Sequence, residues 1–348
     1  MVVAQFKSSP AVPWSRRSTG LFVCLLSGTR SCRLLVVLVT LIASSYGAAQ
    51  AGIDETHVLP RAMPTPFASP QQVLRAHTDL VLVNVTVLDS AGRTVTGLEP
   101  ANFALLDDRN PQSVRYLSNA DEPISLVVVL DVSASVASKI QGERKAFHEL
   151  VNTSNPEDDF GLILVSDKPR IALHFDDPAS ESQATVDSLQ PEGFTALWDG
   201  MYLGIKELKN SHCQRKAMVV ISDGGDNHSQ YTESELKALL KEADVEVYAI
   251  GMFDRYPRRM EERKGPLQLD EVTSVTGGRV FSVHDSVELS RAVTQISREL
   301  RNQYVLGYYP SNRSRDGKWR GLKIRLTGSA SQAKFRLYAK KGYYAPSE

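Results

Sequence analysis

The sequence has 348 residues, of which 42% are hydrophobic and 23% charged, with 40 basic and 40 acidic side chains. This length allows roughly two domains of ordinary size, and the hydrophobic content is ample for a buried core. The first 51 residues hold Lys7, Arg16, Arg17, Arg30 and Arg33 and no acid, so the rest has 40 − 5 = 35 basic against 40 acidic side chains, a net charge of −5. This balance argues against a nucleic-acid partner.

Residues 1–51 have the pattern of a secretory signal peptide. Basic residues precede the apolar run 34–42, and small residues with an Ala-x-Ala pattern at 49–51 follow it. The run is too short for an ordinary membrane span. We therefore expect an exported protein, whether secreted, periplasmic or on the cell surface, with cleavage near Ala51; an uncleaved signal anchor is the alternative. Cleavage leaves Cys213 as the last cysteine, and we expect it to be a small buried residue.

Residues 52–76 contain four prolines and little periodicity, which predicts a flexible Pro-rich arm. Residues 77–119 form an N-terminal β segment, with strands expected at 80–88, 103–108 and 113–117 and with Arg109, Asn110 and Pro111 as a connection. Residues 303–348 form a C-terminal β segment, with strands expected at 303–309, 321–326 and 333–338. Each segment is too small to bury a core alone. Our hypothesis is that both form one small β-sandwich around the region between them.

That region, residues 120–302, alternates strand and helix patterns. Strands are expected at 124–131, 160–165, 170–175, 217–221, 245–250 and 279–282, with 170–175 as an antiparallel edge strand. Helices are expected at 139–151, 198–208, 233–243, 267–275 and 287–300, and Thr232 is the expected N-cap of the third. Strands separated by helices predict an α/β fold with a doubly wound, mostly parallel sheet.

The strand 124–131 is apolar and β-branched, which is typical of a central strand covered on both faces. It ends in Asp131, and Ser133 and Ser135 follow at alternate positions. One carboxylate and two hydroxyls suit a hard divalent cation such as Mg²⁺. Ligands of open α/β sheets bind at the carboxyl ends of the strands. Turn-forming and helix-capping roles for the same residues are the alternative.

Two further loops carry oxygen side chains. Asp223 follows the expected strand 217–221 and precedes Gly224. Thr195 precedes the expected helix 198–208, and it is also an expected N-cap of that helix. Asp226 is either a further acid of the same site or a cap of its own turn, and we expect the turn. His174 and His228 are the histidines expected near these loops, and the charged run 254–264 is expected to be a solvated loop.

In their order and their placement at strand ends, these residues resemble the metal ion-dependent adhesion site of von Willebrand factor A domains. The resemblance covers roughly residues 122–300. It implies that Asp131, Ser133, Ser135, Thr195 and Asp223 bind Mg²⁺ or Mn²⁺ directly or through water, and that a partner carboxylate completes the octahedron. Phe194 departs from the family, where many relatives have Gly. The flanks resemble a group of exported bacterial von Willebrand factor A-related proteins through Tyr304-Val-Leu-Gly-Tyr308.

The resemblance predicts an exported adhesion-type module that binds a protein ligand presenting an Asp or Glu carboxylate. A structural scaffold within an envelope assembly is one alternative. A Mg²⁺-dependent hydrolase is another, but the sequence has no Gly-x-Ser-x-Gly elbow, no phosphate-binding P-loop and no clustered His and Cys set. We therefore expect a binding protein that is not an enzyme.

Overall fold

The computed structural model describes residues 80–177, 179–254 and 260–347. The expected signal peptide (1–51) and the Pro-rich arm (52–76) lie outside the described residues. All described residues fall within one unit of the chain, residues 73–348.

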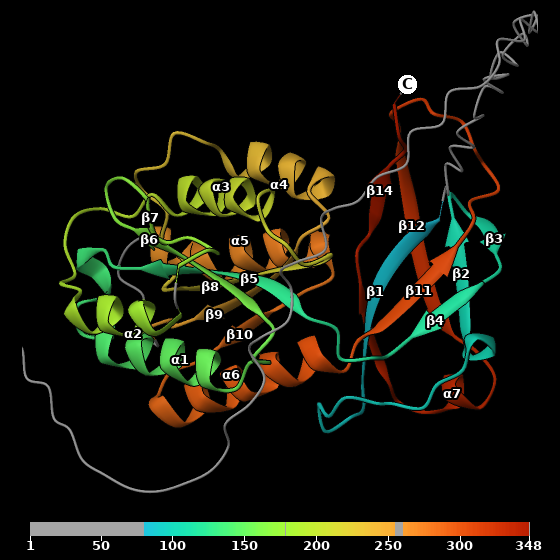
Figure 1. Cartoon of the computed structure of the whole chain (residues 1–348), viewed down its shortest axis with the longest axis horizontal. Helices are drawn as coiled ribbons and strands as arrows, with labels where there is room; N and C mark the ends of the chain where they lie inside the picture. Colours follow the sequence, from blue (N-terminus) through green and yellow to red (C-terminus); the bar gives the residue numbers. More distant parts are fainter. Residues whose placement is uncertain (1–79, 178, 255–259, 348) are drawn as a thin grey trace, which may run out of the picture. The chain divides into compact units, whose positions relative to one another are not determined.

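A mixed sheet forms the centre of the region between the two β segments (Figure 1). Its strand order is β10-β9-β8-β5-β6-β7. The strands are β5 (Ile124–Asp131), β6 (Asp159–Val165), β7 (Arg170–Leu173), β8 (Arg215–Ser222), β9 (Glu246–Gly251) and β10 (Val280–Ser282). Every pairing is parallel except that of β6 with β7, which is antiparallel. The predicted doubly wound sheet with an antiparallel edge strand is confirmed.

Strand β5 is buried along its whole length because helices cover both faces of the sheet. Leu126, Val128 and Leu130 pack into a hydrophobic cluster with α1, α2 and α6, whereas Val127 and Val129 pack into a second cluster with α3, α4 and α5. The helices are α1 (Ile140–Asn152), α2 (Ala179–Ser188), α3 (Leu197–Leu208), α4 (Glu233–Glu242), α5 (Met260–Thr276) and α6 (Ser286–Arg301). Because successive side chains of a strand point to opposite faces of the sheet, β5 contributes to two separate hydrophobic cores.

The two flanking segments interleave their strands in two antiparallel sheets, of order β13-β1-β11-β4 and β14-β12-β2-β3. The strands are β1 (Val81–Leu88), β2 (Phe103–Asp107), β3 (Asn110–Gln112), β4 (Tyr116–Ser118), β11 (Tyr304–Tyr308), β12 (Trp319–Leu326), β13 (Arg336–Ala339) and β14 (Gly342–Tyr344). One hydrophobic cluster joins Val85 of β1, Leu105 of β2 and Leu306 of β11. Each sheet therefore needs strands from both ends of the described chain, as the sandwich hypothesis requires.

Helix α6 leads almost directly into the sandwich, because β11 begins three residues after the helix ends at Arg301. Gln303, in this connection, is buried. Its amide nitrogen donates to Glu246 Oε1 at 2.8 Å, and its amide oxygen accepts from Arg215 Nη2 at 2.8 Å. The same amide nitrogen donates to the Thr86 hydroxyl of β1 at 3.1 Å. The side chain of Gln303 therefore links the first residues of β8 and β9 to strand β1 of the sandwich.

Several sequence expectations for the β segments are wrong in detail. The connection expected at Arg109, Asn110 and Pro111 lies earlier in the sequence, because the chain turns at Asp108 and Arg109, whose φ angles are 45° and 70°. Asn110–Gln112 is instead the short strand β3, where Pro111 is tolerated because β3 is an edge strand. The expected strand 113–117 is displaced to β4, and the one expected at 333–338 begins only at Arg336.

The expected helices are present, with three departures. Helix α2 was not expected, and neither was the short helix α7 (Ser329–Gln332) in the C-terminal segment. Helix α5 begins at Met260, so part of the charged run 254–264 is helical and not a loop. Its Pro266 lies early in the helix, within the region that the helical pattern did not reach. Two 3₁₀ turns, Pro100–Asn102 and Ala134–Val136, complete the described elements.

Candidate metal site

The first site loop leaves the carboxyl end of β5, where Asp131 is completely buried. Its Oδ1 accepts a hydrogen bond from the backbone N–H of Ser133 at 2.9 Å, and its Oδ2 accepts one from the Ser222 hydroxyl at 2.7 Å. The hydroxyls of Ser133 and Ser135 lie 2.9 Å apart. These contacts fix the carboxylate and bring both hydroxyls to the same end of the strand.

The environment of Asp131 disfavours its own charge. Burial, together with the negative charge of Asp223, raises the pKa of Asp131 to about 6, although the hydrogen bonds from Ser222 and Ser133 act in the opposite direction. The two carboxylates are therefore close enough to repel one another. A cation placed between them would remove both penalties, because it favours the ionised form of each.

The second loop, which carries Thr195, is hydrogen-bonded to the first. The backbone N–H of Ala134 donates to the carbonyl of Gly193 at 3.1 Å, and that of Glu192 donates to Val132 at 2.9 Å. Gly193 has φ of +77°, and a Cβ there would lie 2.7 Å from Asp167 Oδ1. Only glycine fits this turn without displacing Asp167, which accepts a hydrogen bond from the Phe194 N–H.

The third loop follows β8 and holds the second loop in place. The side chain of Asn227 accepts a hydrogen bond from Thr195 N at 2.9 Å, and Asp226 Oδ1 accepts one from Leu197 N at 2.9 Å. Asp226 therefore caps helix α3 from another loop, and the same Oδ1 also accepts a hydrogen bond from the Ser229 hydroxyl at 2.5 Å within its own turn, where the sequence predicted its role. The expected N-cap role of Thr195 is wrong, because Ala196 is the N-cap residue of helix α3 and its side chain makes no capping hydrogen bond.

Asp223 is buried at the start of this third loop, and its Oδ1 accepts a hydrogen bond from Gly225 N at 3.3 Å. The five residues singled out from the sequence thus lie on three loops at the carboxyl edge of the sheet. Hydrogen bonds join the first loop to the other two, and the second to the third. Sequence reasoning missed the supporting residues Ser222 and Asn227; the hydroxyl beside Asp223 was the available signal for Ser222.

An exposed aromatic pair borders the site. Phe194 is 59% exposed, and its ring stacks on that of His228 with centroids 5.2 Å apart. His228 thus lies beside the site loops, as expected. The expectation for His174 is wrong: it follows β7, which runs antiparallel, and its Nδ1 lies 2.8 Å from Glu207 Oε1 at the last turn of α3. That position is toward the opposite edge of the sheet.

The donor set fits a hard cation. Asp131, Ser133, Ser135, Thr195 and Asp223 offer only oxygen, which suits Mg²⁺, Mn²⁺ or Ca²⁺ better than soft metals. Within residues 80–177, 179–254 and 260–347, no three His, Cys, Asp or Glu side chains are grouped so that they could hold a metal by themselves. A cation at this edge would therefore need the hydroxyls as well as the two acids.

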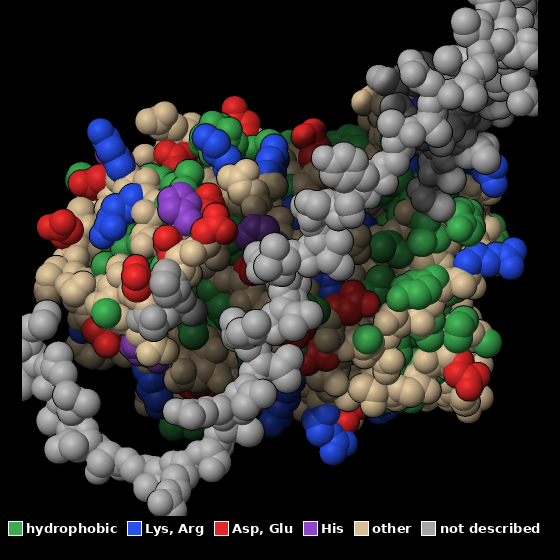
Figure 2. Space-filling view, in the orientation of Figure 1, with side chains coloured by type: hydrophobic (Ala, Val, Ile, Leu, Met, Phe, Trp, Pro, Cys, Tyr) green, Lys and Arg blue, Asp and Glu red, His purple; other side chains and the backbone are tan. Residues whose placement is uncertain are grey.

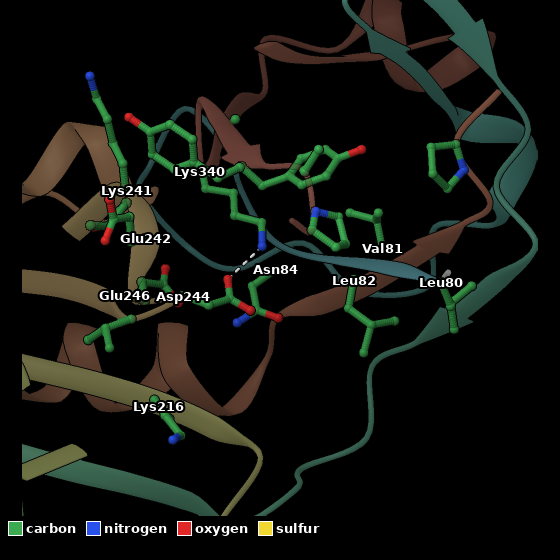
Figure 3. A pocket seen from close by; sticks show the side chains of 18 of the residues that line it. Leu80, Val81, Leu82, Asn84, Lys216, Lys241, Glu242, Asp244, Glu246 and Lys340 are labelled. Atoms are coloured by element: carbon green, nitrogen blue, oxygen red, sulfur yellow. Dashed lines mark hydrogen bonds and ion pairs between the residues drawn. The ribbon is translucent and has the colours of Figure 1, made fainter. Parts of the chain in front are cut away.

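A cavity of about 700 Å³ lies elsewhere, at the amino ends of β8 and β9, where its lining includes Arg215, Lys216 and Glu246 (Figure 3). In Figure 3 the Lys340 side chain reaches toward Asp244, and the Nζ to Oδ1 contact is 2.5 Å. The lining mixes both signs of charge, so no single ligand class follows from it. On the face shown in Figure 2, acidic and basic side chains are likewise interspersed over the α/β region.

Two other sequence expectations concern the whole chain. Cys213 is a free thiol and half-buried, and burial raises its pKa, so it is poorly suited to act as a nucleophile. Among the helices that the structure describes, none combines the length and the apolar character needed to cross a membrane.

Comparisons with known proteins identify the family. Residues 125–295 match the family model described as von Willebrand factor type A domain. A protein of Borreliella burgdorferi, described only as uncharacterized, is 21% identical over 197 residues, or 50% of this chain. The chain spans 58% of that relative's length.

Several solved structures are similar to parts of the chain at low identity. A von Willebrand factor type A protein from Catenulispora acidiphila is 11% identical, with 77% of this chain and 72% of that chain covered and a TM-score of 0.45. An aerotolerance-related membrane protein from Bacteroides fragilis is 18% identical, with 51% and 98% covered and a TM-score of 0.41. Proximal thread matrix protein 1 from the mussel byssus, described with a zinc-occupied MIDAS motif, is 17% identical, with 55% and 48% covered and a TM-score of 0.43. The chain is a von Willebrand factor type A domain protein, and the domain occupies residues 125–295.

Proposed function

We propose that the protein is an exported, metal-dependent protein-binding module. Asp131, Ser133, Ser135, Thr195 and Asp223 hold a divalent cation, Mg²⁺ or Mn²⁺, and an Asp or Glu carboxylate of a protein partner completes its coordination. Residues 1–51 act as the export signal and 52–76 as an arm. Residues 120–302 carry the binding site, and the segments 77–119 and 303–348 support it as one sandwich.

The observation that carries this proposal is the network of hydrogen bonds between the three loops. Two acids and three hydroxyl side chains come from separate parts of the sequence, yet the loops that bear them are fastened to one another by backbone contacts such as Ala134 to Gly193. A turn or a helix cap needs no such convergence. The raised pKa of Asp131 also supports it, because a buried pair of acids is costly unless a cation lies nearby.

The charge of the donor set favours binding over catalysis. Asp131 and Asp223 together balance a divalent cation, and the remaining donors are neutral hydroxyls. The ion therefore keeps an affinity for one more negative oxygen, which an incoming carboxylate supplies. The cation contributes electrophilic attraction at the loop edge. The chain's residues hold it there, and Phe194 with His228 offers an apolar surface for the partner residues next to that carboxylate.

Calorimetric titration of the purified protein with Mg²⁺ and Mn²⁺ tests this function. We expect one binding site in the wild type and none in Asp131→Ala or Asp223→Ala. Asp176→Ala is the matched control, because Asp176 has a side chain that is 88% exposed. Unchanged Mg²⁺ binding by Asp131→Ala would refute the site. A partner captured equally well with and without chelator would refute the metal-dependent mode of binding.

A further inference from the structure

Glu143, in the first turn of helix α1, has a buried carboxylate without a hydrogen-bond partner. The residue is 0% exposed, and neither of its carboxylate oxygens meets a donor among the residues that the structure describes. An ionised carboxylate in this position is costly, because the water that would solvate it is excluded. A protonated carboxyl group would also lack a partner for its hydroxyl. Glu143 therefore needs a partner that the described residues do not supply.

The charged groups that act on Glu143 belong to the metal site or border it. Burial raises the pKa of Glu143 well above its usual range, the carboxylates of Asp131 and Asp223 raise it further, and Lys139 acts in the opposite direction. The Lys139 ammonium group is engaged elsewhere, since it donates to the carbonyl of Met252 at 2.8 Å and pairs with Asp254 at 3.1 Å. The negative charges of Asp131 and Asp223 therefore reach Glu143, and the nearby Lys139 ammonium group makes its close contacts with Met252 and Asp254 instead.

The local sequence explains why an acid occupies this position. Helix α1 begins at Ile140, shortly after the 3₁₀ turn Ala134–Val136 that contains Ser135. Glu143 lies on the same buried face of the helix as Ile140 and Phe147. An apolar side chain could pack on this buried face of the helix without the cost of burying a charge. A carboxylate at this position is explained if it interacts with a group bound at the preceding loop, which carries Ser133 and Ser135.

We propose that Glu143 is a third carboxylate of the cation site and positions the bound ion, together with Asp131 and Asp223, from the helix side. The inference rests on the proposed function. Because no three acidic side chains in the described ranges are grouped to chelate a metal directly, Glu143 acts through an intervening water and not as a direct ligand. It is therefore a positioning residue.

Three negative charges change what the site prefers. With two acids, a divalent cation is balanced and readily accepts a partner's carboxylate. With Glu143 ionised as well, the ion is held more tightly, and a trivalent cation such as Tb³⁺ gains more than Mg²⁺ does. Removing the charge of Glu143 should therefore weaken Tb³⁺ binding more than Mg²⁺ binding, whereas a purely structural role in the core would not discriminate between the two ions.

The test compares Glu143→Gln, which keeps the size of the side chain, with Glu149→Gln on the same helix as the matched control. Titration calorimetry with Mg²⁺ and Tb³⁺ should show Mg²⁺ affinity about 10- to 100-fold weaker in Glu143→Gln, the usual range for loss of an outer-shell partner. The loss for Tb³⁺ should be larger. Glu149→Gln should bind both ions as the wild type does.

The outcomes separate this inference from the proposed function. If the wild type binds no metal, the function itself fails. If the wild type binds, Asp131→Ala does not, and Glu143→Gln binds both ions within twofold of the wild type, only the role of Glu143 is overturned. Should Glu143→Gln fail to fold, Glu143→Asp replaces it: a retained preference for Tb³⁺ supports the role of the charge, and a lost preference overturns it.

Discussion

Replacing Asp131 by asparagine should stabilise the metal-free protein while abolishing its response to metal. Burial and the nearby Asp223 raise the pKa of Asp131 from its ordinary value of 3.8 to about 6. A difference of one in pKa corresponds to about 1.4 kcal/mol, so ionising Asp131 costs the metal-free fold about 3 kcal/mol. Asparagine keeps the shape of the side chain without this charge.

The sign of the effect depends on pH. Protonated Asp131 stabilises the fold relative to the ionised form, and this contribution is fully present below pH 3.8 and is lost as the pH rises through about 6. The difference in unfolding free energy between Asp131→Asn and the wild type should therefore be near zero at pH 4 and reach its maximum above pH 6. At pH 7.5 it corresponds to a rise in Tm of about 6–12 °C.

Differential scanning calorimetry in the presence of chelator, between pH 4 and 8, measures this difference. In a second series, Mg²⁺ at 100 times its Kd should stabilise the wild type at pH 7.5 by about 2.7 kcal/mol and leave Asp131→Asn unchanged. Asp176→Asn, at an exposed position, serves as the control for charge removal. A stability difference that does not vary with pH would show that Asp131 is not held in the environment described above.

Two further substitutions address the loop that carries Thr195. Phe194→Ala removes a ring that is 59% exposed and stacked on His228, so partner affinity should fall, by roughly 1–2 kcal/mol for a rim aromatic, while Mg²⁺ affinity stays unchanged. Parallel titrations of metal and partner check this, and equal losses for both would contradict a contact role. Gly193→Ala places a Cβ 2.7 Å from Asp167 Oδ1 at φ of +77°, so the unfolding free energy should fall by about 1–3 kcal/mol and Mg²⁺ binding should weaken. Chemical denaturation and calorimetry measure these two effects, and an unperturbed variant would mean that the turn can relax.

The sheet could be predicted because its signals are local. The apolar run of β5 and the acid at its end are visible within one stretch, and Thr232 has the sequence pattern of a capping box, which the structure confirms through reciprocal contacts with Glu235. The alternation of helix and strand patterns then limits the topology to a few arrangements. The pairing of strands from both ends of the described chain followed from the small size of each segment.

The features that were missed depend on long-range contacts. Asp226 caps a helix that precedes it in the sequence, and Glu143 looks like an ordinary polar residue of a helix until its burial is known. The direction of β7, not the composition around it, carries His174 away from the site loops. The helix expected at 267–275 extends back to Met260 through Pro266, and its Leu269 and Val272 pack into the second hydrophobic cluster of the sheet.

The direct passage from α6 into β11 limits how this domain could transmit a signal. Sliding of the helix along its axis by one turn, about 5.4 Å, would draw roughly one to two residues of strand out of the sandwich. Strand β11 is paired on both sides, with Val305 opposite Asn84 and Ser118, and a one-residue slip would turn Tyr304, Leu306 and Tyr308 away from the hydrophobic cluster of the sandwich. The pairing of β11 in the sandwich therefore opposes any sliding of helix α6 along its axis. Any metal-dependent change would have to stay within the loops, or else remodel the whole sandwich in one step.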